Sequence, residues 1–385
     1  MNILIVTTAF PRWIGDSRAP FILEAAQALH RKGHVVRVLA MHAPKSKTHE
    51  SWDGIEIYRP RYLPERFEIL QREEGGLPVT WNKGGFSRFA IVPFVVVNSL
   101  AVVKQARDVD LIHANWTLSA GCVWLTKWLH RKPWVVTVHG SDIFQAGKKP
   151  IIRWLTRIVL RKADKVIAVS KALAMEVASL GVPQNSIEVI PDGVDTNKFL
   201  AGEDFREPII LFVGSLIERK DPFSLLFAFK GIVDQIGLLR LVFIGDGPLR
   251  KSLEETTVKI GLASNVDFLG NQPQEQVRQW MKKAKVFVLP SVEEGLGVVL
   301  LEALASGTPC VASNVGGIPD IITEEVGILI PPHDPQAIQT AIFKTIQDEA
   351  LWKEFSNNAR RRAEIIYDWD KVADRIIELY TEIIR

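Results

Sequence analysis

The sequence predicts an α/β protein built from two doubly wound parallel-sheet domains whose strand ends face a central cleft. Short β-branched runs alternate with helical stretches along the chain, which implies right-handed crossovers and sheets covered by helices on both faces. The alternation forms two series separated by a turn-rich stretch at 192–206. At 385 residues the chain also exceeds one ordinary hydrophobic core, so two domains are expected.

The first series begins at the N-terminus with an apolar, β-branched strand. Its expected strands are Asn2–Thr8, Val35–Met41, Asp110–Asn115, Trp134–Gly140, Lys165–Ser170 and Ser186–Gly193, and its expected helices are Pro20–Lys32, Leu118–His130, Ile151–Lys162 and Lys171–Leu180. The apolar run from Phe89 to Val103 is interrupted by Pro93 and is shorter than the roughly 20 residues that span a membrane. We therefore expect a buried helix there.

The second series repeats the scheme and ends in an amphipathic helix from Trp369. Its expected strands are Ile209–Ser215, Leu239–Gly247, Asn265–Gly270, Val286–Ser291, Thr308–Asn314 and Gly327–Pro332, and its expected helices are Pro222–Gln235, Leu249–Ile260, Gln274–Lys283 and Gly295–Gly307. Open α/β sheets bind ligands at the carboxyl ends of their strands. The residues that follow each strand are therefore the candidates for function.

The composition is that of a soluble globular protein, with 47% hydrophobic and 24% charged residues. Cys122 and Cys310 are the only cysteines and lie far apart, so we expect no disulfide framework and a reducing cytoplasm. The N-terminus has neither the basic region nor the cleavage site of a signal peptide, so a secreted precursor is not expected. No nucleic-acid partner is expected.

The two halves of the chain differ in charge. Residues 1–195 hold 26 Lys and Arg against 17 Asp and Glu (+9), and residues 196–385 hold 21 against 27 (−6). In the basic half, segment 148–165 repeats an arginine every four residues, at Arg153, Arg157 and Arg161, beside Trp154 and Ile158. Such a helix either presents a solvated basic face or contacts an anionic membrane surface, and the sequence favours neither.

Two glutamates flank the start of the helix expected at Gly295–Gly307. Glu294 lies just before it, and Glu302 lies five residues beyond Gly297, about 7.5 Å along the axis at 1.5 Å per residue. The amides at a helix start that follows a strand bind anions. The spacing therefore suits a nucleoside diphosphate-sugar, with the diphosphate at the helix start, ribose at Glu302 and the sugar at Glu294.

A glutamate within a helix is most often a solvated surface residue. This helix, however, is apolar nearly all round and leaves no polar face for Glu302. Its apolar residues are Val298, Val299, Leu300, Leu301, Ala303, Leu304 and Ala305. Burial of a carboxylate is costly unless a ligand or partner satisfies it, so we prefer the functional interpretation of Glu302.

The complete motif resembles that of the retaining glycosyltransferases of family 4 (group 1), which share the two-domain GT-B fold. It consists of Pro290-Ser291, Glu294-x7-Glu302 and Ala305-x-Gly307-x-Pro309. The resemblance extends from the first strand to the Trp369 helix. It implies an N-terminal acceptor domain at 1–195, a C-terminal nucleotide-sugar domain at 196–368, and a final helix, 369–385, that packs back on the N-terminal domain.

The resemblance also implies how the second half binds a diphosphate. Lys220, six residues past Gly214, occupies the position of the family's phosphate-binding lysine. The arginine that usually follows this glycine is Ser215 here, and we expect Arg219 to supply its charge. The backbone amides of Leu296, Gly297 and Val298 complete the expected diphosphate site.

Glycines elsewhere in the second half allow two interpretations. Gly245 and Gly247 lie where the family's backbone approaches the nucleotide base, but a tight strand-to-helix turn would use the same glycines. Gly316 and Gly317 resemble another loop of the family that faces the cleft. We interpret these two as turn glycines.

In the first half, the resemblance points to residues after two strands. The family places a histidine beside the donor sugar at the position of His139, whose ring we expect to project into the cleft, although a lone histidine is most often structural. Gly15 lies where many relatives have a Gly-Gly pair that contacts phosphate, and its amide is expected to do the same. Asp16 and Ser17 depart from that pair, and Asp16 suggests contact with acceptor or sugar hydroxyls.

No metal or cofactor is expected. The eight histidines show no ligand spacing, and lysine, arginine and helix amides would neutralise the diphosphate. The resemblance implies metal independence as well.

We therefore interpret the chain as a retaining glycosyltransferase that moves a sugar from a UDP-sugar to an acceptor hydroxyl, in glycan, polysaccharide or glycolipid synthesis. Its catalytic candidates are Lys220, Arg219, Glu294 and His139. The acceptor, whether glycan, lipid-linked or small molecule, would be chosen by loops such as Tyr58–Arg88. A cytoplasmic location follows, and peripheral contact with the membrane stays open.

Two alternatives stay open. One is an enzyme of the same fold with different chemistry, either a nucleotide-sugar epimerase or a phosphorylase. A phosphorylase should carry a cofactor-binding lysine motif, and none is recognised here. The other is a non-catalytic sugar-nucleotide sensor, which would retain Glu302 without needing Lys220 or His139.

Overall fold

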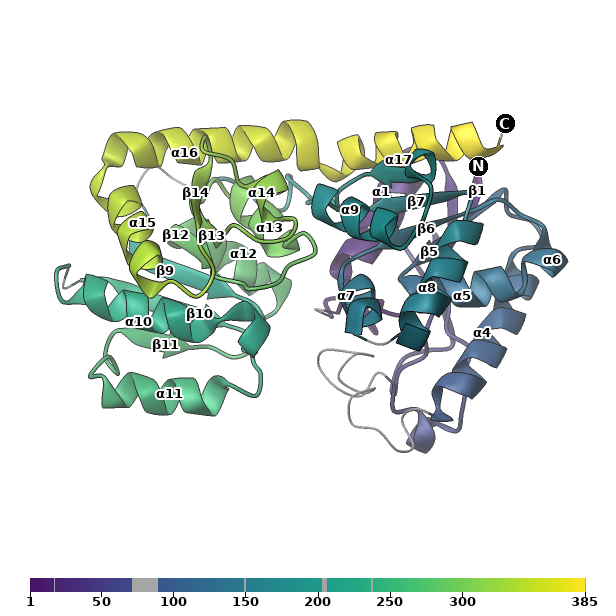
Figure 1. Ribbon diagram of the computed structural model, residues 1–385, viewed down its shortest axis with the longest axis horizontal. Helices are drawn as coiled ribbons and strands as arrows, with labels where there is room; N and C mark the ends of the chain where they lie inside the picture. The colour runs from purple at the N-terminus through teal and green to yellow at the C-terminus, as the bar shows by residue number, and fades with distance from the viewer. Residues whose placement is uncertain (17, 71–88, 149, 203–205, 237, 385) are drawn as a thin grey trace. The chain divides into compact units, whose positions relative to one another are not determined.

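The computed structural model describes the chain except residues 17, 71–88, 149, 203–205, 237 and 385, and except the side chains of 145–149 (Figure 1). It divides into two compact units. Unit 1 comprises Met1–Asp192 and Trp369–Arg385, and unit 2 comprises Gly193–Asp368. Our predicted division lay between residues 195 and 196. Most of the loop Tyr58–Arg88, to which we attributed acceptor choice, lies outside the described residues.

Unit 1 is built on one eight-stranded sheet in the order β3-β4-β2-β1-β5-β6-β7-β8. Its strands are β1 (Asn2–Thr7), β2 (Val35–Ala40), β3 (His49–Trp52), β4 (Ile55–Tyr58), β5 (Leu111–Asn115), β6 (Trp134–Val138), β7 (Lys165–Ala168) and β8 (Ile187–Val189). The strands pair in parallel except β3, which is antiparallel to β4. The strand order reverses between β1 and β5, which is therefore the switch point of the sheet.

The β3–β4 hairpin was not predicted. Asp53 and Gly54 connect the two strands with positive φ angles of 49° and 82°, the backbone that an Asp-Gly pair adopts in a tight two-residue hairpin. This dipeptide was the sequence signal for the hairpin.

The helices of unit 1 cover both faces of its sheet. They are α1 (Pro20–Arg31), α4 (Ile91–Gln105), α5 (Thr117–Leu125), α6 (Lys127–His130), α7 (Ser141–Lys148), α8 (Pro150–Lys162), α9 (Lys171–Ser179) and α17 (Trp369–Ile384), with short 3₁₀ turns at Glu65–Phe67 and Gln184–Ser186. The helix expected at Leu118–His130 is two helices. Thr126 separates them, and its hydroxyl donates to the carbonyl oxygens of Cys122 and Val123.

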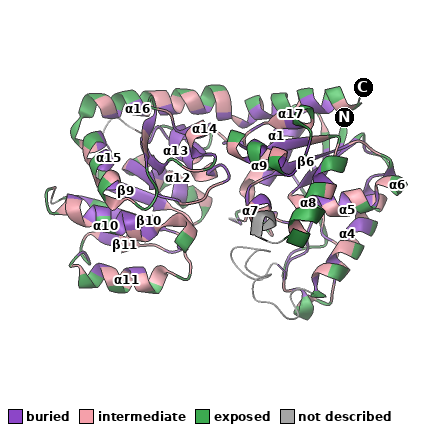
Figure 2. Ribbon diagram, in the orientation of Figure 1, coloured by how far each residue is buried: buried purple, intermediate pink, exposed green. Residues whose placement is uncertain are grey.

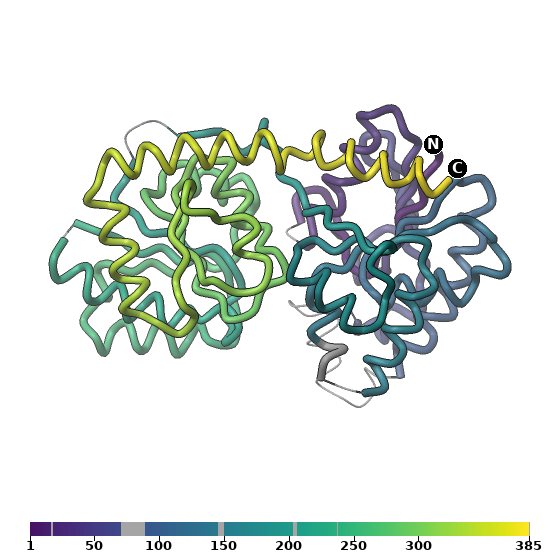
Figure 3. The backbone as a smooth tube through the Cα atoms, turned by 45° about the horizontal axis from the view of Figure 1, so that its top comes forward, coloured from purple at the N-terminus to yellow at the C-terminus, as the bar shows by residue number. Residues whose placement is uncertain are grey.

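The C-terminal helix α17 belongs to unit 1, where it lies against α1 (Figure 3). Its inner face is buried at Val372, Ile376 and Tyr380. Tyr380 Oη lies 2.5 Å from Nδ1 of His113 on β5. The tail of the chain is therefore tied to the centre of the unit 1 sheet.

The apolar stretch Phe89–Val103 forms α4, but the expectation that it is buried throughout is wrong. Phe94 and Val102 face the core, whereas Val92, Val96 and Leu100 are 53–65% exposed (Figure 2). These three recur every four residues and so form one outward stripe. Among the described residues, no helix is both long and apolar enough to cross a membrane.

Unit 2 is built on one six-stranded, fully parallel sheet in the order β11-β10-β9-β12-β13-β14. Its strands are β9 (Glu207–Val213), β10 (Arg240–Ile244), β11 (Val266–Phe268), β12 (Ala284–Leu289), β13 (Cys310–Ser313) and β14 (Gly327–Ile330). The order reverses between β9 and β12. Gly214, which follows β9, and Ser291, which comes two residues after β12, therefore belong to adjacent strand ends at the switch point.

The helices of unit 2 are α10 (Pro222–Val233), α11 (Arg250–Lys259), α12 (Gln274–Lys283), α13 (Val298–Ala305), α14 (Ile318–Ile321), α15 (Pro335–Gln347) and α16 (Glu349–Arg362), with a 3₁₀ turn at Glu218–Lys220 and a π-helical turn at Ala363–Tyr367. The helix expected at Gly295–Gly307 is α13 and is shorter. Gly297 has a left-handed backbone with φ of 92°, which ends regular helical geometry on its N-terminal side. The predicted class of two doubly wound sheets is confirmed, with β3 as the antiparallel exception.

Candidate functional site

The switch point of unit 2 brings together a cation and a carboxylate from adjacent strand ends. Lys220, in the 3₁₀ turn after β9, donates from Nζ to Oε2 of Glu294, in the loop after β12. The two side chains are 13% and 12% exposed. Ser291 Oγ lies 3.4 Å from the same carboxylate oxygen. Two sequence-predicted residues that are 74 positions apart are thus in direct contact.

Arg219 makes two hydrogen bonds to the loop that carries Glu294. Its Nη1 donates to the Glu293 carbonyl at 3.2 Å, and its own carbonyl accepts from the Val292 amide at 2.9 Å. Burial acts to raise the pKa of Glu294, but the charges of Lys220 and Arg219 outweigh it, and the pKa is lowered from its ordinary value. Glu294 is therefore held as a carboxylate.

The backbone around Glu294 is closely approached by glycines. A Cβ on Gly316 would lie 1.9 Å from the Glu294 carbonyl oxygen, and the Gly317 amide donates to that oxygen at 3.2 Å. A Cβ on Gly297 would lie 3.4 Å from Cγ of Glu294. Our interpretation of Gly316 and Gly317 as turn glycines therefore has a steric reason, since no side chain fits at Gly316.

Glu302 lies on the one accessible face of α13. The five buried residues of this helix are Leu300, Leu301, Ala303, Leu304 and Ala305. The three others, Val298, Val299 and Glu302, are half-buried, and their spacing of three and four places them on one face. The helix has no other polar residue on this face, as expected, but our expectation that Glu302 would be buried is wrong, because core packing covers only the opposite side. The carboxylate shares this face with the first turn of the helix.

The remaining glycines at this edge are explained by contacts within the protein. A Cβ on Gly245 would lie 2.0 Å from the Gly214 carbonyl oxygen, and one on Gly247 would lie 2.4 Å from the Leu216 carbonyl oxygen. These glycines therefore allow the loops after β9 and β10 to pack backbone to backbone. Ser215, which lies between Gly214 and Leu216 in the chain, is exposed. Leu296, in the loop before α13, is a core residue that is 3% exposed.

In unit 1, the loop after β1 is braced by its own aspartate. The Asp16 carboxylate accepts from the Arg12 amide at 2.9 Å and from Arg12 Nε at 2.7 Å. Burial acts to raise the pKa of Asp16, but its bonds to Arg12 lower it overall. Gly15 is exposed with φ of 88°. Since Asp16 is bonded within its loop at 4% side-chain exposure, our expectation that it meets acceptor or sugar hydroxyls is not supported; Ser17 lies outside the described residues.

His139 follows β6, but its ring is enclosed. Nε2 lies 2.9 Å from Asn115 Oδ1, and Nδ1 lies 3.4 Å from Asp192 Oδ2. The rings of Trp116 and Phe21 lie 4.6 and 5.2 Å away, centroid to centroid. The His139 side chain is 7% exposed. Our expectation that this ring projects into the cleft is not supported, because aromatic and polar neighbours of unit 1 hold it.

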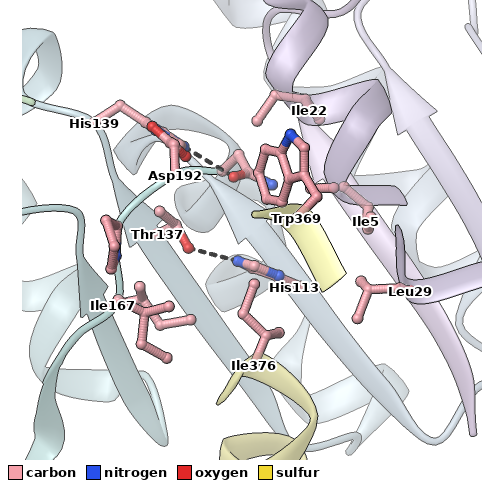
Figure 4. A pocket seen from close by; sticks show the side chains of 14 residues that line it. Ile5, Ile22, Leu29, His113, Thr137, His139, Ile167, Asp192, Trp369 and Ile376 are labelled. Atoms are coloured by element: carbon pink, nitrogen blue, oxygen red, sulfur yellow. Dashed lines mark hydrogen bonds and ion pairs between the residues drawn. The ribbon is translucent and has the colours of Figure 1, made fainter. Parts of the chain in front are cut away.

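Beneath His139 lies a small cavity of about 30 Å³ (Figure 4). It is lined by residues of unit 1 that include Asn115, Thr137 and Trp369. Thr137 Oγ1 and Nε2 of His113 are 2.7 Å apart across it. A nucleotide-sugar needs several hundred Å³, so this cavity is too small to be a substrate pocket, although a water molecule would fit.

The sequence does contain two Asp-x-Asp patterns, Asp108-x-Asp110 and Asp368-x-Asp370, which our expectation of no metal overlooked. Asp108 pairs with Arg37, Asp110 accepts from the Asn2 amide, Asp368 accepts from Thr196 and Asp370 pairs with Arg31. No group of three or more metal-ligating side chains occurs in the described part of the chain.

Sequence reasoning assigned no separate role to three polar residues at these strand ends, although it named Ser291 within the motif. Ser291 contacts Glu294, and Asn115 and Asp192 hold His139. Each lies at or just after the end of a strand, which was the available signal. Asp192 was noted only as part of a turn at the domain boundary.

Comparison with known proteins identifies the family. Residues 194–362 match the family described as glycosyl transferases group 1, and residues 19–198 match glycosyltransferase family 4. A D-inositol 3-phosphate glycosyltransferase of Corynebacterium urealyticum is 30% identical over 315 residues, which cover 73% of each chain. The chain belongs to glycosyltransferase family 4. An uncharacterised glycosyltransferase of Methanocaldococcus jannaschii is 29% identical over 99% of this chain and 98% of its own.

Solved structures confirm the GT-B fold. Sucrose-phosphate synthase from Thermosynechococcus elongatus superposes with a TM-score of 0.81 at 23% identity and covers 99% of this chain and 98% of its own. Anabaena HepE, solved in complex with UDP-glucose, gives a TM-score of 0.76 at 19% identity, with 99% of this chain and all of that chain covered. The chain is thus a family 4 glycosyltransferase, and the family is one of retaining enzymes.

Proposed function

We propose that this glycosyltransferase transfers a sugar from a UDP-sugar to an acceptor hydroxyl without a metal ion. The observation that carries the proposal is the Lys220–Glu294 pair at the switch point of unit 2, beside the start of α13 and its accessible Glu302 face. Anabaena HepE was solved with UDP-glucose, which supports uracil as the base. Unit 2 is the proposed donor domain and unit 1 the proposed acceptor domain.

In this proposal each residue of unit 2 has a separate task. Lys220 carries three N–H donors, of which Glu294 takes one, so the ammonium can also meet a phosphate oxygen. Arg219 and the amides near Gly297 add positive potential at the diphosphate. Glu302 accepts hydrogen bonds from ribose hydroxyls. Glu294 accepts hydrogen bonds from sugar hydroxyls through Oε1, because Lys220 and Ser291 both contact its other carboxylate oxygen, Oε2.

The chemistry then requires positioning and electrostatics more than a protein base. The bond between the anomeric carbon and the leaving phosphate breaks, the acceptor oxygen bonds to that carbon on the same face, and the phosphate takes the acceptor proton. Charge develops on the diphosphate, which Lys220 and Arg219 stabilise. His139 is proposed to shape the sugar side from unit 1. Because both its ring nitrogens contact unit 1, we expect it to matter less than Lys220.

A donor screen with product analysis tests the proposal. The protein is incubated with UDP-, GDP- and ADP-sugars, with and without candidate acceptors and with EDTA, and released nucleotide and product mass are measured. We expect acceptor-dependent UDP release that EDTA leaves unchanged, and an α-configured product from an α-configured donor. Conversion of the UDP-sugar to its epimer without any acceptor would favour an epimerase. Binding of nucleotide without release of product under any condition would favour the sensor.

A further inference from the structure

Neighbouring helices of unit 1 expose large apolar side chains in one area. α4 packs against α5 and α6, and α5 packs against α8 (Figure 1). Nine of the 21 large apolar side chains that the described residues expose lie on these four helices. They are Val92, Val96 and Leu100 on α4, Leu125 on α5, Trp128 and Leu129 on α6, and Ile151, Trp154 and Leu155 on α8. We call these nine residues the apolar face.

The helices that carry the apolar face have charge of one sign only. The sequences of α4, α5, α6 and α8 contain no Asp and no Glu. They carry Lys104, Lys127, Arg153, Arg157, Arg161 and Lys162, and Arg131 and Lys132 follow α6 directly. Of these, Lys104, Arg131 and the four cations of α8 are exposed. The exposed charges that these four helices carry beside the apolar face are therefore all positive.

The position of the apolar residues on α8 decides between the two interpretations of this helix. Its buried side consists of Thr156, Val159 and Leu160. Ile151 and Trp154 lie on the opposite side and are 73% and 61% exposed. Arg161 and Lys162 are exposed on this same side, two and three turns further along the helix. The outward side of α8 therefore combines apolar and cationic side chains, which favours contact with an anionic membrane over a purely solvated basic face.

We propose that the apolar face docks unit 1 on an anionic bilayer. The acyl boundary accepts the aliphatic side chains, Trp128 and Trp154 suit the headgroup level, and anionic headgroups pair with the surrounding Lys and Arg. A second copy of the chain is a poorer occupant, because its apolar face would bring the same positive charge. Docking through this face would bring unit 1 to an acceptor carried by a membrane lipid. The involvement of such an acceptor rests on the proposed function.

Vesicle sedimentation tests the docking. The full chain is mixed with vesicles of phosphatidylcholine alone or with about 30% phosphatidylglycerol, at low and high salt. We expect binding only to anionic vesicles, weakened by salt because exposed charges are screened. Each cation near an anionic surface contributes about 1 kcal/mol to binding. A triple variant should therefore bind more weakly on the order of 100-fold; its substitutions are Arg153→Gln, Arg157→Gln and Arg161→Gln.

Two further variants separate docking from general charge attraction. Trp128→Gln with Trp154→Gln should reduce binding at least about 10-fold without altering the circular dichroism, because both side chains are exposed. The matched control removes three exposed lysines of unit 2, through Lys251→Gln, Lys259→Gln and Lys353→Gln, and should bind as the unchanged protein does. UDP affinity should be the same in all variants, so that a failure here leaves the proposed function intact.

Three outcomes would overturn the docking. The first is no sedimentation with anionic vesicles at low salt. The second is equal binding by the double tryptophan variant, which would reduce the effect to charge alone. The third is a concentration-dependent dimer in analytical ultracentrifugation that the double tryptophan variant abolishes, which would assign the apolar face to a second copy.

Discussion

The two units carry polar residues in the loops after their parallel strands but use them differently. In unit 2, Lys220 and Glu294 meet at the switch point, with side chains 13% and 12% exposed, next to the accessible face of α13. In unit 1, Asp16 and His139 are 4% and 7% exposed and bind neighbours of their own unit. A strand end therefore makes a residue a candidate, but its local contacts decide whether its polar atoms can serve a ligand.

The largest effect should come from the cation of unit 2. Lys220→Ala should lower kcat by a factor on the order of 100 or more, because the charge that we propose to stabilise the developing diphosphate is lost. Steady-state kinetics with a UDP-sugar measures it. Lys230→Ala is the control, since Lys230 is exposed and pairs with Asp234 on the same helix turn. A raised KM with an unaltered kcat would assign Lys220 to ground-state binding instead.

Substitution of Glu302 tests whether unit 2 binds the donor nucleotide, independently of catalysis. Glu302→Ala should weaken UDP binding by about 1–3 kcal/mol, the scale of a lost hydrogen bond to a charged group. Calorimetry with UDP and GDP gives the affinities, and Glu324→Ala provides an exposed glutamate of the same unit as control. If the affinity for every nucleotide is unchanged, the accessible face of α13 is not the ribose site.

His139 should behave as a residue held within unit 1. His139→Ala leaves the partner atoms of Asn115 and Asp192 without their contacts, which should lower the free energy of unfolding by about 1–2 kcal/mol. Denaturant titration measures this loss, and calorimetry should show unchanged UDP affinity. A fall in kcat as large as that of Lys220→Ala, with stability unaltered, would show that the ring acts directly on the sugar and would remove the contrast between the units.

The smallest effect concerns the loop brace of unit 1 and depends on pH. The pKa of Asp16 is lowered in the folded state, so its contribution to stability is complete above its unfolded pKa of about 3.9 and is lost as pH falls through the folded value. Asp16→Asn should therefore lose less stability than the unchanged protein between about pH 4 and pH 2. Thermal unfolding across this range measures the difference, with exposed Asp234→Asn as control. If stability falls equally with pH in the variant and in the unchanged protein, the hydrogen bonds from Arg12 to Asp16 do not stabilise the fold.

The structure brings together two residues that the sequence singled out in unit 2, Lys220 and Glu294, whereas in unit 1 the predicted residues bind neighbours of their own unit. Glu294, Lys220 and Glu302 were all singled out, because their motif has a fixed spacing within short segments. The same reasoning misplaced the ring of His139 and the role of Asp16. The error for His139 arose because Asn115 and Asp192 become its neighbours only when loops from different strands fold together. Arg12 precedes Asp16 by four residues in the same loop, but outside a helix that spacing does not predict a contact.

The sequence by itself determined the two alternating series, the parallel sheets and the Glu294–Glu302 motif, since periodicity and spacing are local properties of a chain. Only the tertiary structure decided the strand order, which places Gly214 beside Ser291, and the left-handed Gly297 at which α13 begins. It also decided that Val92, Val96 and Leu100 face outward. The strand order and the outward stripe depend on contacts between segments distant in sequence, which hydrophobic periodicity does not encode. The φ of Gly297 is a backbone angle, which periodicity does not encode either.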